Sequence, residues 1–255
     1  MREKIRKIRL RWFSQWSVRH VGFVMLVTAF VVAVMGYLNL HRNWLGPFPL
    51  VADFYANIST ELASVALTVL VIDALNERRA IQQEKEFLML QMSSPTNAIA
   101  REAVRVLRVR GWLIDGTLKR ANLLRANLRK AFLEKADLRE AFLLKADLSG
   151  AYLQWANLKG TRELELTQLV QVAYLRGATL QDGSRYDGRF KLAGDLKWAR
   201  TSKKIALNNA PAMADFYNVP LQDYREGQKW AKKNLAKLRQ QAAAVSRKRF
   251  TAGDE

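Results

Sequence analysis

The sequence predicts a two-helix transmembrane hairpin followed by a repeat solenoid and a helical tail, and two observations lead to this prediction. A leucine occupies every fifth position from Leu113 to Leu158, and from Ala121 onward an alanine stands two residues before each leucine. A period of five matches neither the helix period of 3.6 nor the strand period of 2, so it indicates units that bury their apolar side only against neighbouring units. The second observation is the uncharged run from Val21 to Leu40, which is long enough to cross a hydrocarbon core of about 30 Å.

The repeat units read A-N-L-L-R, A-N-L-R-K, A-F-L-E-K, A-D-L-R-E, A-F-L-L-K, A-D-L-S-G, A-Y-L-Q-W and A-N-L-K-G, from Ala121 to Gly160. This pattern resembles the pentapeptide-repeat family. The resemblance implies a right-handed quadrilateral β-helix with one repeat on each side and the leucines inside. Residues 61–79, 173–190 and 212–234 also resemble membrane-anchored bacterial members of this family, which implies an architecture but no activity.

We expect five regions along the chain. They are a basic amphipathic segment at 1–19, a transmembrane hairpin at 20–75, a helical connector and N-terminal cap at 76–110, the β-helix with an inserted helix and a C-terminal cap at 111–192, and a basic helical tail at 193–255. Lysine and arginine are frequent before the first span and directly after the second, whereas the loop between them has only Arg42. The positive-inside rule therefore places both termini in the cytoplasm, and we expect a multi-pass protein of a bacterial inner or other energised internal membrane.

The composition argues against catalysis. Cysteine is absent, and the two histidines, His20 and His41, bracket the first span, so no metal-ligand spacing is present. Glycine-rich phosphate loops and the G-x-S-x-G motif are absent as well. We expect no catalytic, cofactor-binding or metal-binding residues, no small-molecule substrate, and a protein that is not an enzyme. The net charge of +19 instead suggests an anionic partner.

The second predicted span, roughly Val51 to Leu75, carries polar residues on one helical face. They follow one another at steps of four, four, three and four residues: Asp53, Asn57, Glu61, Ser64 and Thr68. A charge near the bilayer midplane costs at least about 2.5 kcal/mol, so Glu61 is not expected to face lipid. Three interpretations remain open: a hydrogen bond within the helix pair or an oligomer, an ion or proton path, or a shallow position in which Glu61 reaches water. Because two helices make a thin bundle, we expect a homo-oligomer or a larger membrane complex.

The outer surface of the repeat follows from its period, because residues twenty apart stack if four repeats make one turn. One side then presents Phe132, Tyr152 and Trp155, and the opposite side presents Leu124, Phe142 and Leu144. Exposed apolar patches of this kind are typical of docking surfaces. The alternative is that the connector or the C-terminal helices of the same chain cover them.

The predicted tail helix, from Leu221 to about Arg247, is strongly basic. Its candidate contacts to an anionic surface are Lys229, Lys232, Lys233, Lys237 and Arg239. A solvated face, contact with anionic lipid headgroups or an acidic protein, and contact with nucleic acid are all compatible with this pattern. Nucleic acid is the least favoured, because no recognised nucleic-acid-binding fold accompanies the basic run.

These observations together favour a non-catalytic, membrane-tethered scaffold or accessory subunit that docks a protein partner through the outer sides of the repeat. One alternative is an oligomeric channel or transporter-like assembly lined by the polar face of the second span. Another is a membrane-anchored nucleic-acid binder.

Overall fold

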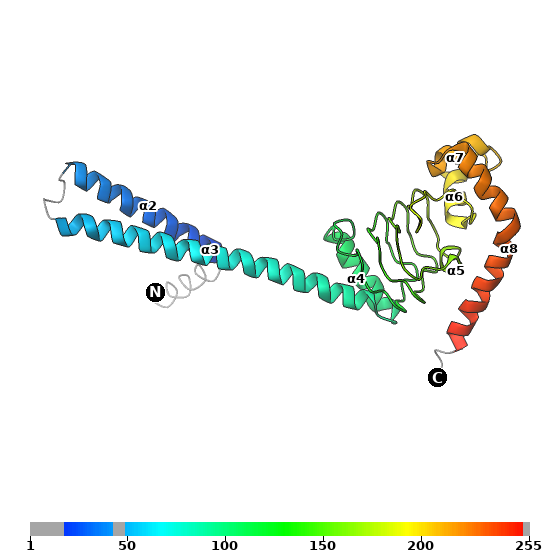
Figure 1. The fold of residues 1–255 in the computed structure, drawn as a ribbon, viewed down its shortest axis with the longest axis horizontal. Helices are drawn as coiled ribbons and strands as arrows, with labels where there is room; N and C mark the ends of the chain where they lie inside the picture. The colour runs from blue at the N-terminus through cyan, green and yellow to red at the C-terminus, as the bar shows by residue number, and fades with distance from the viewer. Residues whose placement is uncertain (1–17, 43–48, 252–255) are drawn as a thin grey trace, which may run out of the picture. The chain divides into compact units, whose positions relative to one another are not determined.

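The computed structural model describes residues 18–42 and 49–251, and describes side chains within 18–38 and 57–247 (Figure 1). The chain divides into two compact units, Met1–Gln83 and Glu84–Glu255. Most of the basic segment expected at 1–19 and most of the loop between the two apolar helices lie outside the described residues, as does the side chain of Asp53.

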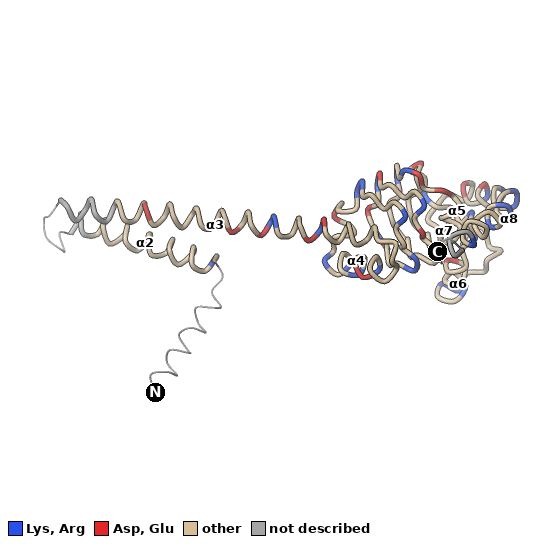
Figure 2. Tube along the Cα trace, turned by 90° about the horizontal axis from the view of Figure 1, so that it is seen from below, with Lys and Arg blue, Asp and Glu red and all other residues tan. Residues whose placement is uncertain are grey.

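The first unit is built from two long helices, α2 (Val18–Arg42) and most of α3 (Pro49–Met92). They pack through small residues: Ala29 and Ala66 are buried, and a Cβ atom on Gly22 would lie 2.7 Å from Leu70 Cγ. The Arg19 guanidinium reaches across from α2, with its Nε 3.0 Å from Asp73 Oδ2. Both helices are long and apolar enough to cross a membrane, and charged residues are sparse along them (Figure 2). α3 is one continuous helix, so the expected second span and the expected connector share a single element.

The second unit contains the repeats, and each repeat leucine from Leu113 to Leu158 is buried. Parallel bridges join residues twenty apart, for example Asn122 to Phe142 and Phe132 to Tyr152. Four repeats of five residues therefore complete one turn of the chain. The bonds between turns are regular, with Leu123 N 2.9 Å from Phe142 O. We refer to residues 113–162 as the repeat coil.

The predicted fold class, a right-handed quadrilateral β-helix, is wrong for the described residues, which contain α-helices and isolated bridges but no strand or sheet. The reason lies in the backbone of each repeat. Only one residue in five bridges to the next turn, and the last residue of most repeats has a positive φ, for example 56° at Arg125 and 60° at Lys135. Because this turn interrupts the chain after every bridge, no two successive residues pair and no ladder forms.

Helical segments close both ends of the repeat coil. α4 (Asn97–Val109) buries Ala100, Val104 and Leu107 in the same apolar cluster as the first repeat leucines. The segment before α4 takes the place of a preceding turn: Ser94 O accepts a hydrogen bond from Asn127 N at 3.0 Å. The coil therefore does not end on open backbone groups at this side.

After Thr161 the spacing between stacked residues rises from twenty to twenty-two, as in the bridge from Tyr152 to Tyr174. The short helix α5 (Leu166–Leu169) lies within this insertion, and the repeat pattern resumes after it. Three further helices follow: α6 (Ala193–Thr201), α7 (Ala210–Tyr217) and α8 (Leu221–Thr251). α8 packs on α7 and α5 through small and apolar residues of one face, namely Tyr224, Gly227, Ala231, Leu235, Leu238 and Ala242.

Candidate interaction surfaces

Three aromatic side chains stack on one side of the repeat coil and its extension. The ring centroids of Phe132 and Tyr152 are 4.6 Å apart, and those of Tyr152 and Tyr174 are 5.2 Å apart. We call this set the aromatic ladder. Phe132 is 44% exposed, although the Arg108 guanidinium lies 5.4 Å from its ring centroid, and the two tyrosines are half-buried.

Trp155, predicted on the same side, is partly covered by its own chain. The Arg176 guanidinium lies 5.2 Å from the Trp155 ring centroid and also stacks on Trp198 and Phe216. Arg176 Nε donates a hydrogen bond to Phe216 O, which links the coil to α7. Trp155 remains 37% exposed, so the C-terminal helices shield one face of it and leave the other open.

The opposite apolar side is more open. Leu124 is 40% exposed, and Phe142 and Leu144 are half-buried. Beside Leu124 a cavity of about 580 Å³ runs between the end of α3 and the first repeats. We call it the Leu124 groove; its apolar lining is Met89, Leu90, Ala121 and Leu124. Leu90 is 72% exposed. It lines the Leu124 groove because it lies near the end of α3, a position that the repeat period does not predict.

Charged residues surround this apolar floor. Lys119 and Arg120 line the groove on the repeat side, and Glu86 lines it on the α3 side. Glu140 anchors both cations, at 3.5 Å from Lys119 Nζ and 2.6 Å from Arg120 Nε. The hydrogen bond from Arg120 lowers the pKa of Glu140. The groove therefore combines an apolar floor with a charged border, in which Lys119 and Arg120 are paired with Glu140 but stay partly exposed.

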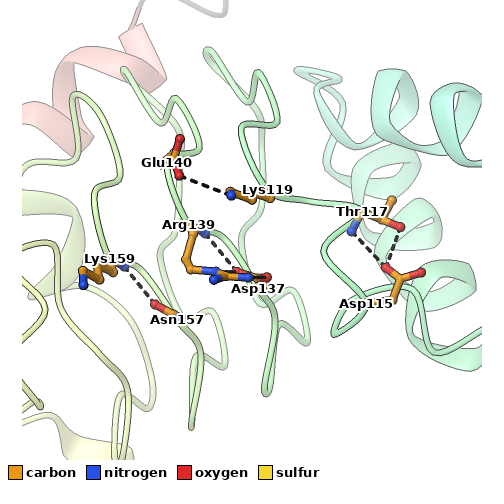
Figure 3. A network of polar contacts seen from close by, with 8 residues as sticks. All are labelled: Asp115, Thr117, Lys119, Asp137, Arg139, Glu140, Asn157 and Lys159. Carbon is orange, nitrogen blue, oxygen red and sulfur yellow. Dashed lines mark hydrogen bonds and ion pairs between the residues drawn. The ribbon is translucent and has the colours of Figure 1, made fainter.

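The remaining sides of the coil are polar, and their Asp and Asn residues have a structural role (Figure 3). Asp137, Asp147 and Asn157 each accept a hydrogen bond from the backbone two residues later; for example, Asn157 Oδ1 lies 3.1 Å from Lys159 N, and Asp137 Oδ1 lies 3.3 Å from Arg139 N. Asp137 also binds the Arg139 guanidinium with both oxygens, at 2.7 and 2.6 Å, which lowers the pKa of Asp137. Such side-chain turns stabilise the corners of these repeats.

The predicted polar face of the second span lies on α3, and its side chains point away from α2. Asn57, Glu61, Ser64 and Thr68 are all exposed in the structure. Ser64 and Thr68 are each two residues from the buried Ala66, or about 200° around the helix. α2 packs on the other side of α3, so the structure shows no bond from Glu61 to a described residue of α2. A bond within an oligomer, an ion or proton path and a shallow position all stay predictions.

The basic residues of α8 fall into two groups. Lys229, Lys232, Lys233 and Lys237 are exposed opposite the packed face. Arg239 contributes to the packing instead: its Nη2 donates to Phe190 O and Lys191 O, both at 3.2 Å. We call the four lysines the lysine face; Arg239 is also exposed, but these two carbonyls hold its guanidinium.

One carboxyl in the C-terminal cap, that of Asp195, has a strongly raised pKa and is not among the site residues predicted from the sequence. Asp195 is fully buried on α6; its Oδ2 accepts from Leu175 N at 3.2 Å. Its Oδ1 and the nearby Tyr217 hydroxyl have no hydrogen-bond partner among the described residues. Burial raises the pKa of Asp195 to about 7 and also raises that of Tyr217. Nothing around Asp195 in the local sequence distinguishes it from an ordinary acidic residue in the first turn of a helix.

Among the residues that the structure describes, no three His, Cys, Asp or Glu side chains lie together in a way that could hold a metal ion. The comparison with protein families matches residues 113–143 and 126–162 to the model described as Pentapeptide repeats, in eight copies. No curated protein and no solved structure matches the chain. The buried leucines at every fifth position and the bridges between residues twenty apart agree with this match. Residues 113–162 of the chain are therefore pentapeptide repeats.

Proposed function

We propose that this protein is a non-catalytic, membrane-tethered scaffold that docks a protein partner on the outside of its repeat coil. The observation that carries the proposal is the Leu124 groove, where exposed Leu90 and Leu124 border a cavity of about 580 Å³. Exposed apolar surface with a polar border is typical of interaction sites. Pentapeptide-repeat proteins are generally non-catalytic, which agrees with a docking role.

The chemistry of the groove favours an acidic, amphipathic segment as the docked part of the partner. Apolar side chains of that segment would cover Leu90 and Leu124, and its carboxylates would meet Lys119 and Arg120 at the border. Complementary charge at the rim of an interface mainly raises the association rate and the specificity. The aromatic ladder is a second docking surface under the same proposal, and Phe132 is its most open member.

The tether in this proposal is the pair of apolar helices, which we propose cross a bacterial inner or other energised internal membrane with both termini in the cytoplasm. Their length and composition support insertion. The lysine face of α8 would then add contacts to anionic headgroups. Retention of the full-length chain in membranes after alkaline extraction tests insertion directly.

Photo-crosslinking in the native cell tests the docking surface. A photoreactive amino acid at Leu124 is expected to give one discrete adduct, and the same amino acid at Lys159, on a polar side, is expected to give none. The adduct should disappear in the Leu90→Asp variant, because a charge in the groove repels an acidic partner and removes apolar contact. An adduct that forms equally at Lys159, or that survives Leu90→Asp, would exclude the groove as the docking site.

A second candidate function is an oligomeric channel or transporter-like assembly lined by the polar residues of α3. The exposure of Asn57, Glu61, Ser64 and Thr68 favours it, since these side chains are not used against α2. The purified protein in planar bilayers should then conduct ions, and Glu61→Gln should change the conductance.

A further inference from the structure

The polar residues Asn57, Glu61, Ser64 and Thr68 form a continuous exposed line along α3, which we call the polar stripe. It lies opposite the side of α3 that packs on α2, where Ala66 is buried and Leu70 meets Gly22. The small residues of the hairpin are therefore packed between its two helices, whereas the polar stripe is exposed on the outside of α3.

This arrangement is unfavourable if the hairpin enters a membrane alone. The Glu61 carboxyl has no hydrogen-bond partner among the described residues, and ionisable groups within a span are expensive unless another group pairs with them. Thr68 differs from Glu61, because its hydroxyl donates to the Ser64 carbonyl of its own helix at 2.9 Å, just as the Thr28 hydroxyl on α2 donates to the Val24 carbonyl at 2.8 Å. Large apolar residues such as Phe23 and Phe30 cover the rest of the exposed α2 surface, which suits lipid.

We infer that the polar stripe is a helix–helix interface that a second copy of this chain occupies. This inference rests on the membrane insertion proposed above. The side chains of the stripe both donate and accept hydrogen bonds, so the stripe is complementary to itself. Every inserted copy also presents the same stripe at the same depth and in the same orientation, whereas any other partner would need a matching polar line of its own.

The structure restricts the geometry of this contact. α2 already occupies the Ala66 side of α3, so another α3 helix cannot pack there, whereas the stripe side is open to it. Two parallel copies related by a twofold axis would bring each stripe residue close to its equivalent. Glu61 of one copy then lies within reach of Ser64 and Asn57 of the other, and interhelical hydrogen bonds of this kind stabilise association in lipid.

Disulfide cross-linking of the full-length chain in membranes tests the interface, because the protein has no cysteine of its own. Ser64→Cys and Thr68→Cys should give covalent dimers. Leu67→Cys is the matched control for Thr68→Cys: it is exposed at the same depth, but it lies about 100° from Thr68 around the helix. We expect at least about a tenfold excess of dimer at the stripe positions, since helix contacts in membranes are confined to one face.

A second pair of variants separates hydrogen bonding from shape. Glu61→Leu should weaken association by about threefold to thirtyfold, the range that interhelical hydrogen bonds in membranes produce, and Glu61→Gln should restore most of it. Equal cross-linking at Leu67 and Thr68 overturns the interface. Rapid reaction of Ser64→Cys with a water-soluble thiol reagent also overturns it, because that result indicates a water-filled path. Alkaline extraction reports insertion separately: a released chain contradicts the membrane tether, whereas a retained chain without the Ser64 adduct contradicts the interface alone.

Discussion

The two units of this chain place their large apolar side chains in opposite positions. In the helical hairpin, small residues such as Gly22, Ala29 and Ala66 are packed inside, and large apolar residues such as Phe30 are exposed. In the repeat unit the large leucines are inside and charged residues cover the outside (Figure 2). The exposed apolar surface of the hairpin agrees with the membrane insertion proposed above, whereas the charged outside of the repeat unit is typical of a protein surface in water.

The largest effect that tests this comparison is expected in the repeat interior. Leu133→Ala should lower the free energy of unfolding of the repeat unit by about 2–5 kcal/mol, because it leaves a cavity among side chains that cannot easily collapse. Leu124→Ala, at an exposed position of an equivalent repeat, should change it by less than about 1 kcal/mol. Pulse proteolysis in urea of the full-length protein measures both. Loss of the α2–α3 hairpin together with the repeat in Leu133→Ala would show that the two units do not fold independently.

A smaller effect is expected at Gly177, which follows Arg176 at the end of a repeat. Its φ is +71°, and a Cβ atom there would lie 2.4 Å from Trp155 Cε3. Gly177→Ala should therefore destabilise the unit by about 1–3 kcal/mol and displace the indole. Gly160→Ala is the matched control, with a φ of +69° and its nearest contact at 3.6 Å, to Glu140 Cγ. Since Lys and Arg occupy this position in other repeats, positive φ alone is tolerated, and equal losses in both variants would contradict the role of Trp155.

The buried carboxyl of Asp195 predicts that the free energy of unfolding of the repeat unit depends on pH. Because its pKa is raised to about 7, the folded protein keeps a proton that the unfolded chain releases near its ordinary pKa of 3.8. The free energy of unfolding should therefore fall as the pH rises from about 4 to about 7, and level off above that. Asp195→Asn, which is neutral throughout, should remove this slope in thermal unfolding followed by circular dichroism. A slope that persists in the variant would assign the pH dependence to another group.

The sequence predicts the repeat interior well, because one leucine in five suffices to identify the buried position and the twenty-residue turn. It fails on the fold class, since the resemblance implied a β-helix whereas the turn at residues such as Lys135 prevents successive residues from pairing. The aromatic positions Phe132 and Tyr152 follow directly from the repeat register.

The rest of the candidate surfaces depends on contacts between distant segments, which a period cannot encode. Leu90 joins the Leu124 groove only because α3 ends beside the first repeats. Trp155 loses part of its exposure to Arg176, whose position is set by the insertion around α5 and the bond to Phe216. Neither contact has a local sequence signal.

The smallest effect on stability, and the sharpest test of what the surface contacts, is expected on α8. Replacing Lys229, Lys232, Lys233 and Lys237 with Gln should leave the free energy of unfolding within about 0.5 kcal/mol, because these side chains are exposed. The same change should weaken contact with anionic lipid, where each lysine near the surface contributes about 1 kcal/mol at low salt. A fluorophore on Ala236→Cys in the full-length protein reports this contact through lipid-borne quenchers in nanodiscs with and without phosphatidylserine.

Arg239→Gln is the matched control for these lysines, because Arg239 bonds to the carbonyls of Phe190 and Lys191. It should lower the stability of the C-terminal cap and leave the phosphatidylserine-dependent quenching intact. The opposite pattern, with quenching lost in Arg239→Gln and retained without the lysines, would contradict the distinction between Arg239, which bonds to backbone carbonyls, and the lysine face.

A fluorescence signal that responds to an added oligonucleotide and not to phosphatidylserine would assign the lysine face to nucleic acid. Electrostatic contact with either ligand must weaken as salt rises, so a salt-independent signal would exclude both.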